Sequence, residues 1–68
     1  MLVKDPKVLS KLMTIEGVSQ RELAAAAGWR SHSYLGRLLR GDARSLEREP
    51  ARRIARRLGV DVDDLFRT

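Results

Sequence analysis

Apolar residues recur every three or four positions along most of the chain, and glycines separate the resulting segments. This spacing places apolar side chains on one face of a helix, whereas a half-buried strand would need alternation at every second residue. The pattern predicts five short helical segments and no strand. We therefore expect an all-α fold, a compact bundle of five short helices.

The first predicted helix begins after Asp5, has Pro6 at its first position and ends at Gly17. An aspartate side chain accepts a hydrogen bond from an unpaired N–H at a helix start, and a proline there loses no hydrogen bond. Glycine is the commonest residue just beyond a helix end. The predicted apolar stripe of this helix consists of Val8, Leu9, Leu12, Met13 and Ile15.

The segment "SQRE" predicts that a second helix starts at Ser19. The Ser19 hydroxyl can accept from the Glu22 N–H while the Glu22 carboxylate accepts from the Ser19 N–H, an arrangement called a capping box. This helix is expected to stop at Gly28, and a third helix to run from about residue 31 or 32 to residue 40, before Gly41. The residues expected to face inward are Leu23, Ala24 and Ala27 in the second helix and Leu35, Leu38 and Leu39 in the third.

Pro50 marks the first turn of a fourth predicted helix, which ends at Gly59. Its expected inner face consists of Ala51, Ile54, Ala55 and Leu58. Asp61 caps a short fifth helix whose apolar residues are Val62, Leu65 and Phe66. Asp63 and Asp64 lie in its first turn, where the helix dipole favours negative charge.

The chain has 68 residues and no cysteine, so neither a disulfide nor a thiolate metal site is expected to support the fold. The core must come from the 43% of residues that are hydrophobic. No apolar run has the length of a membrane span, and no signal-peptide pattern opens the chain. A single soluble intracellular domain over residues 1–68 is the expectation.

The net charge of the chain points to the kind of partner that it binds. Lysine and arginine total 14 against 9 acidic residues, which gives a net charge of +5 and a pI near 10.8. A small basic domain suits a polyanion such as nucleic acid. The alternative is a solvated surface from an arginine-rich proteome, and the four arginines at 52, 53, 56 and 57 are expected to be of that kind, because they cannot all face one groove of DNA.

An enzyme is not expected. The chain has one histidine and no cysteine, and no pair of carboxylates converges on a predicted pocket. The cluster of Asp61, Asp63 and Asp64 has the composition of a metal site, but a helix cap explains it. We expect no catalytic residue, no cofactor and no metal.

Two helices joined by a short turn that contains glycine are typical of a helix-turn-helix. The segments "VSQRELAAAAGW", "YLGRLLRG" and "ARRIARRLGVDVDDLF" together resemble the Cro/C1-type (XRE-like) family of phage repressors and bacterial transcriptional regulators. The resemblance implies a lambda-repressor-like DNA-binding domain with its helix-turn-helix core at about residues 19–40. It further implies a cytoplasmic, sequence-specific regulator of the Cro-like or immunity type, bound to the nucleoid when active, that reads the major groove of double-stranded DNA with the helix at about residues 32–40.

Between Gly28 and Gly41 the chain holds one residue more than the usual family pattern. Counting forward from Gly28 would bury Arg37. Counting back from Gly41 puts Leu35 and Leu38 in the core and leaves Arg37 outside. Burial of an unpaired guanidinium costs several kcal/mol, so we expect the second register.

The extra residue is then expected in the turn, around Trp29 and Arg30. We expect the Trp29 ring to be a partly buried cap over this turn, because indole combines a large apolar surface with one polar N–H. The alternative for Trp29 is a contact with a base or a phosphate.

In this register the resemblance assigns two sets of DNA contacts. The expected base contacts are His32, Ser33, Tyr34 and Arg37, and the expected phosphate contacts are Gln20, Arg30, Arg40 and Arg44. Arginine donates in a fork to guanine O6 and N7, and serine and histidine can donate or accept at a base edge. The alternative for His32 is an ordinary surface residue in the first turn of its helix.

One short helix contacts few base pairs, so we expect a homodimer on a palindromic operator, formed either in solution or only on DNA. The resemblance places the dimer contact on Val62, Leu65 and Phe66. The chain ends two residues after Phe66, so no effector domain is expected beyond it. Alternative functions are an antitoxin-type autoregulator and a protein-binding helix-turn-helix module.

Many relatives of this kind carry an arginine at the position of Met13 and a glutamate at the position of Leu39, which form an ion pair. Both positions are apolar here. Replacing both partners of a buried ion pair by apolar residues can be neutral or stabilising. We therefore expect Met13 and Leu39 to touch in the core.

Overall fold

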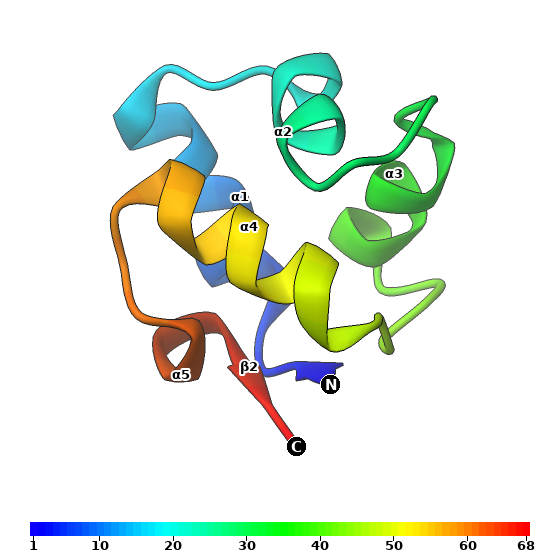
Figure 1. The fold of residues 1–68 in the computed structure, drawn as a ribbon, viewed down its shortest axis with the longest axis vertical. Coiled ribbons are helices and arrows are strands. Elements are labelled where there is room, and N and C mark those ends of the chain that lie inside the picture. Colours follow the sequence, from blue (N-terminus) through cyan, green and yellow to red (C-terminus); the bar gives the residue numbers. More distant parts are fainter.

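The computed structural model describes all 68 residues and contains five helices around one apolar core (Figure 1). The helices are α1 (Pro6–Glu16), α2 (Gln20–Ala26), α3 (Ser33–Arg40), α4 (Arg48–Leu58) and α5 (Val62–Leu65). In Figure 1, α4 crosses the front of the molecule, α1 lies behind it and α3 lies at the right. The predicted all-α fold is confirmed. None of the helices has the length and apolarity needed to cross a lipid bilayer.

The helix starts follow the predicted caps. The Asp5 carboxylate accepts from the Lys7 N–H at 2.9 Å, and Pro6 is the first residue of α1. At the start of α2, the Ser19 N–H donates to Glu22 Oε1 and the Glu22 N–H donates to Ser19 Oγ, each at 3.1 Å. Both caps satisfy N–H groups that have no partner inside the helix.

Helices α1 to α4 also end as predicted, each beside a glycine of positive φ. In each case the N–H groups of the glycine and of the next residue donate back to the last turn. This arrangement uses carbonyl groups that would otherwise lack partners. The glycines are Gly17, Gly28, Gly41 and Gly59.

The core is a single cluster of 16 buried apolar residues, and no polar side chain is buried with them. Its members are Val3, Leu9, Met13, Val18, Leu23, Ala24, Ala27, Leu35, Leu38, Leu46, Ala51, Ile54, Ala55, Leu58, Leu65 and Phe66. The predicted inner faces of α2 and α4 are therefore confirmed, while Leu39 of α3 is only half-buried against the cluster. Three members, Val3, Val18 and Leu46, lie outside every predicted helix.

The predicted stripe of α1 is too wide. Leu9 and Met13 are buried, but Val8 is 42% exposed and Ile15 is 65% exposed. Successive residues of a helix are about 100° apart around its axis, so both exposed side chains lie roughly 100° or more from Leu9. Leu9 and Met13 therefore point into the core, and Leu12 is half-buried against it, as predicted.

The prediction of no strand is wrong. Two short strands, β1 (Leu2–Val3) and β2 (Phe66–Arg67), pair antiparallel, with Leu2 opposite Arg67 and Val3 opposite Phe66. The pairing joins the first and last residues of the chain, whose ends lie near one another at the bottom of Figure 1.

The residues expected to make a dimer contact are mostly inside the protomer. Phe66 is 0% exposed and Leu65 is 2% exposed, because β2 pairs with β1 and carries both side chains into the core. Neither side chain can reach a second copy in this fold, so their assignment as dimer contacts is wrong. Only Val62 is partly exposed to solvent.

The N-terminal segment also holds the loop that follows α3. The Met1 α-amino group donates to the Leu46 carbonyl at 2.7 Å, and the Leu46 N–H donates to the Met1 carbonyl at 2.8 Å. The Val3 N–H donates to the Arg44 carbonyl at 2.8 Å. The segment thus lies between this loop and β2.

Candidate nucleic-acid interface

Helices α2 and α3 are joined by residues 27–32, and the start of this turn depends on Gly28. The Gly28 N–H donates to the Ala25 carbonyl at 3.0 Å and the Trp29 N–H to the Ala24 carbonyl at 2.9 Å. This ending needs a left-handed residue, and Gly28 has φ +89°. A Cβ at Gly28 would also lie 2.9 Å from Nη1 of Arg53, but that flexible side chain could move aside, so the positive φ is what favours glycine.

Trp29 closes the turn against the core. Its side chain is half-buried and packs on the apolar cluster. Its ring meets the Tyr34 ring edge to face, with centroids 5.5 Å apart and an interplanar angle of 82°. The prediction of a partly buried cap over the turn is confirmed.

The register of α3 is the one in which Arg37 points outward. Leu35 and Leu38 are both 0% exposed, while Arg37 is exposed. The helix begins at Ser33, one or two residues later than predicted. Ser31 Oγ accepts from the Ser33 N–H at 3.4 Å, and such a local bond competes with an earlier helical turn.

The N-terminal end of α2 and the exposed face of α3 enclose a shallow hollow, which we call the α3 hollow. It is lined by six residues, none of them hydrophobic. These are Gln20, His32, Ser33, Gly36, Arg37 and Arg40. Five of the eight predicted contact residues are thus brought together in one place.

Gly36 forms the floor of the α3 hollow. A Cβ there would lie 3.1 Å from Nη1 of Arg40 and 3.6 Å from Oε1 of Gln20. The side chains of Gln20, from α2, and Arg40, from the end of α3, therefore both lie beside a residue that has no side chain. Arg40 Nε also pairs with Asp42 at 3.2 Å, but both side chains are more than 60% exposed, so this ion pair adds little stability.

A second hollow continues this surface beyond His32. It is lined by Arg21, Ala24, Ala25, Trp29, Arg30, Ser31 and His32. The predicted residue Arg30 lies here, beside the α3 hollow. Arg21 was not among the predicted contacts, although its place next to Gln20 in the first turn of α2 was a usable signal.

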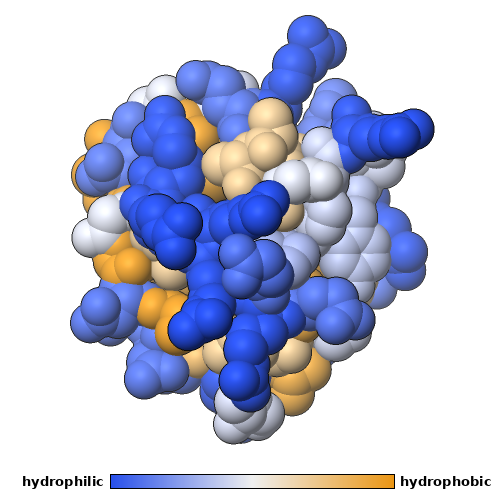
Figure 2. Space-filling view, in the orientation of Figure 1, coloured by the Kyte–Doolittle hydropathy of each residue, from blue (hydrophilic) through white to orange (hydrophobic).

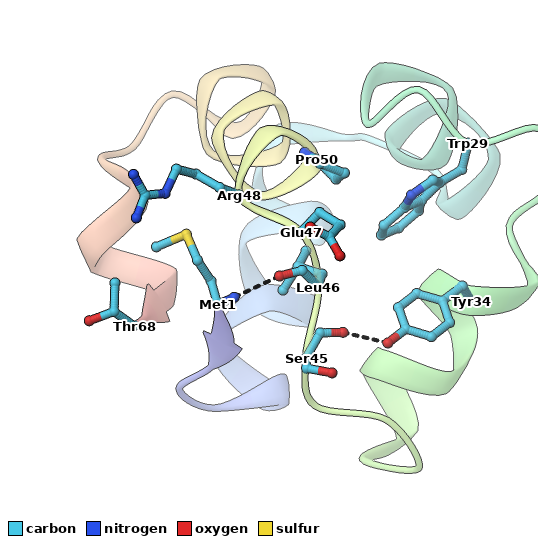
Figure 3. A pocket seen from close by; sticks show the side chains of 9 residues that line it. All are labelled: Met1, Trp29, Tyr34, Ser45, Leu46, Glu47, Arg48, Pro50 and Thr68. Atoms are coloured by element: carbon cyan, nitrogen blue, oxygen red, sulfur yellow. Dashed lines mark hydrogen bonds between the residues drawn. The ribbon is translucent and has the colours of Figure 1, made fainter.

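Tyr34 lies outside the α3 hollow. Its hydroxyl donates to the Ser45 carbonyl, and together with Trp29 it borders a groove along the loop after α3 (Figure 3). The Arg37 guanidinium carbon lies 5.7 Å from the Tyr34 ring centroid. The Tyr34 hydroxyl is thus bonded to the loop, and its ring packs on the core and lies beside Arg37. The expected base contact at Tyr34 stays a prediction.

Arg44 also lines neither hollow. Its side chain is exposed. Arg44 lies in the loop after α3, where its carbonyl accepts a hydrogen bond from the Val3 N–H.

No group of three or more histidine, cysteine, aspartate or glutamate side chains is placed to hold a metal ion.

The capping box of α2 also shifts the titration of its carboxylate. The pKa of Glu22 is lowered mainly because its carboxylate accepts a hydrogen bond from the Ser19 N–H. A hydrogen bond with the Ser19 side chain and the positive charge of Arg57 lower it further. The negative form of Glu22 is therefore favoured at the start of α2, where the helix dipole also favours it.

Two short helices joined by a turn, the second with an exposed polar face, define a helix-turn-helix protein. The sequence profile of the helix-turn-helix domain family matches residues 9–67. The chain belongs to this family, whose module is a DNA-binding one. A search of curated proteins finds no match to the chain.

Proposed function

We propose that the protein is a sequence-specific transcriptional regulator that reads the major groove of double-stranded DNA with α3. The observation that carries this proposal is the α3 hollow, which no hydrophobic residue lines, on a helix whose other side is packed in the core. An eight-residue helix is about 12 Å long. The major groove of B-DNA is about 12 Å wide and admits one helix.

His32, Ser33 and Arg37 are assigned to the bases. They lie together on the exposed side of α3 and its first turn. Arg37 suits guanine, because a guanidinium can donate to O6 and N7 together. Histidine and serine can donate or accept, so they suit more than one base edge.

Gln20 and Arg40 are assigned to phosphates. Both lie within 4 Å of the place that a Cβ of Gly36 would take, where no side chain fills the space. An oxygen atom of the DNA backbone could take a hydrogen bond from both, which would fix the orientation of α3 in the groove. Arg30 extends this surface through the second hollow, and Arg44 stays a proposed phosphate contact at its flank.

Two protomers on a palindromic operator are part of the proposal. A single α3 can reach only a few base pairs, and two half-sites about one helical turn apart would supply the missing specificity. Of the three residues expected at the dimer contact, only Val62 is partly exposed and could contact a second protomer. Repression of the Cro-like or immunity type is supported by the family resemblance, and an antitoxin-type autoregulator would use the same DNA contacts.

Selection from a random duplex library tests the proposal. We expect enrichment of one palindromic sequence, bound about a thousandfold more tightly than scrambled duplex at the same salt concentration. The affinity for both duplexes should fall as salt rises, because bound phosphates release counterions. If no duplex binds with salt-dependent affinity, the protein-binding alternative replaces this function.

A further inference from the structure

The exposed side of α4 carries most of the charge that makes the chain basic. This helix contains five arginines and one acidic residue, Glu49. Without those five arginines the chain would hold nine basic and nine acidic residues and no net charge. The arginines are Arg48, Arg52, Arg53, Arg56 and Arg57, and all of them are exposed. We call their surface the basic α4 face.

The arginines share one side of the helix. The buried residues Ala51, Ile54, Ala55 and Leu58 occupy the opposite side. Figure 2 shows a band of strongly hydrophilic side chains across the face of the molecule on which α4 lies in Figure 1. The basic α4 face therefore points to solvent along the whole helix, about 16 Å at a rise of 1.5 Å per residue.

Two of the arginines have roles within the protein. Arg53 Nε pairs with Glu49 at 3.2 Å and its guanidinium lies close to Gly28. Arg57 is near enough to act on the charge of Glu22. Arg52 and Arg56 have no acidic partner within 4.0 Å. These two, one helical turn apart, are free to bind an external anion.

The basic α4 face is separate from the α3 hollow. Arg53, Arg56 and Arg57 line a hollow with Ala26, and no residue of it belongs to the hollows beside α3. Helix α4 packs mainly on α2, α5 and α1, and α3 is not among its main neighbours. A duplex seated on α3 would thus leave Arg52 and Arg56 unused.

The chemistry of this face fits a phosphate backbone. Arg56 lines a hollow whose only hydrophobic residue is Ala26, and Arg52 lines a separate one with Arg48, Met1, Val62 and Thr68. Neither is lined mostly by hydrophobic residues, whereas interfaces between proteins have an apolar centre. Every basic residue of α4 is arginine, whose planar fork of donors matches phosphate oxygens. Helix α4 has no serine, asparagine, glutamine or histidine that could read a base edge beside these arginines.

We propose that the basic α4 face is a second DNA-binding surface, which holds the phosphate backbone of a second duplex while α3 reads the first. The inference rests on the proposed function, because it assumes that α3 binds DNA. One protein molecule would then join two DNA segments without regard to the sequence of the second.

A capture experiment tests this. A biotinylated duplex on beads is loaded with protein and washed, and a fluorescent duplex of unrelated sequence is then added. The test variant is Arg52→Gln with Arg56→Gln. The matched control is Lys7→Gln with Lys11→Gln, which removes the same charge from two exposed residues with the same spacing on α1, also an 11-residue helix.

We expect the unmodified protein and the lysine variant to capture the fluorescent duplex. The arginine variant should load the beads as well as the lysine variant does, but its capture should fall by about tenfold. The salt slope for capture should fall by roughly two units, because two phosphates of the second duplex would no longer be neutralised. Equal melting temperatures would show that all three proteins are folded.

Loading without capture by the unmodified protein would overturn the second surface and leave the proposed function intact. Equal capture by the arginine variant would also overturn it, since two α3 helices of a dimer would then be joining the duplexes. An equal fall in capture for both variants would overturn it too, because net charge alone would then explain the effect. Failure of the protein to load the beads at all would overturn both proposals.

Discussion

The Arg37 guanidinium carbon lies 5.7 Å from the centre of the Tyr34 ring, and the hydroxyl of that ring donates to the Ser45 carbonyl. Tyr34 thus connects the outward arginine of α3 to the loop that follows the helix. A guanidinium near an aromatic face at an exposed site gains about 0.5–1 kcal/mol. This contact limits the positions of Arg37, which would reduce the entropic cost of the proposed contact with DNA.

The first prediction separates base reading from phosphate binding. Arg37→Ala should cost about 1–3 kcal/mol on the operator and little on scrambled duplex, because it removes a forked donor to one base. Arg40→Ala should weaken both duplexes alike and lower the salt slope by roughly one unit. Affinity measured for both duplexes across a salt series checks this. Equal losses of affinity for Arg37→Ala on both duplexes would make Arg37 a phosphate contact.

The second prediction concerns the two roles of Tyr34. Tyr34→Phe removes only the hydroxyl, so it should lower the free energy of unfolding by about 1 kcal/mol and leave the operator preference unchanged. Tyr34→Leu also removes the aromatic face and should weaken operator binding by about 0.5–1 kcal/mol. Urea unfolding and operator titration measure the two effects. A changed base preference in Tyr34→Phe would mean that the hydroxyl reads a base after all.

The third prediction concerns Gly36. A glycine inside a helix destabilises it by roughly 0.5–1 kcal/mol relative to alanine, so Gly36→Ala should raise the free energy of unfolding by that amount. The added Cβ would lie 3.1 Å from Nη1 of Arg40, which forces this flexible side chain aside. DNA affinity should therefore fall while stability rises. Unchanged affinity in the stabilised variant would place the phosphate contact elsewhere.

Local signals made much of the fold predictable. The capping box of Ser19 and Glu22 and the glycines after α1 to α4 act on neighbouring residues, so the sequence alone defines them. The register of α3 followed from one energetic argument, the cost of burying Arg37. These features placed most of the α3 hollow correctly.

Features that depend on distant parts of the chain were not predictable in the same way. The pairing of Val3 with Phe66 involves strands of two residues, too short to show any periodicity. It takes Phe66 into the core, although its neighbourhood in sequence suits an exposed helix end. The role of Tyr34 depends on where the loop containing Ser45 returns, which no pattern near Tyr34 encodes.

The fourth prediction concerns the core between α1 and α3. Met13 is buried and Leu39 is half-buried against the same cluster, as the expected contact requires. Met13→Arg alone should destabilise the protein by a few kcal/mol, because the guanidinium would lack a partner. Adding Leu39→Glu should restore part of that stability. If the effects of the two single substitutions simply add in the double variant, as measured by urea unfolding, the two side chains do not touch.

The fifth prediction follows from the lowered pKa of Glu22. A carboxylate with a folded pKa below its unfolded value of about 4.3 stabilises the fold above that pH, and the contribution disappears as pH falls through the folded pKa. Glu22→Gln keeps an acceptor for the Ser19 N–H but no charge. It should be less stable than the unmodified protein at neutral pH and equally stable in acid, as thermal unfolding across a pH series would measure. A difference that persists in acid would have another cause.

The hydrogen bonds of Met1 link the start of the chain to α3, the proposed DNA-reading helix. Its α-amine donates to Leu46, and the neighbouring Ser45 carbonyl receives the Tyr34 hydroxyl, whose ring lies beside Arg37. A fusion partner attached ahead of Met1 would turn this amine into an amide with a single N–H and crowd the loop from that side. Thr68 borders the same groove as Met1 and Ser45, so a partner attached after Thr68 would crowd this loop as well. A tag at either end should therefore be removed without leaving extra residues before DNA binding is measured.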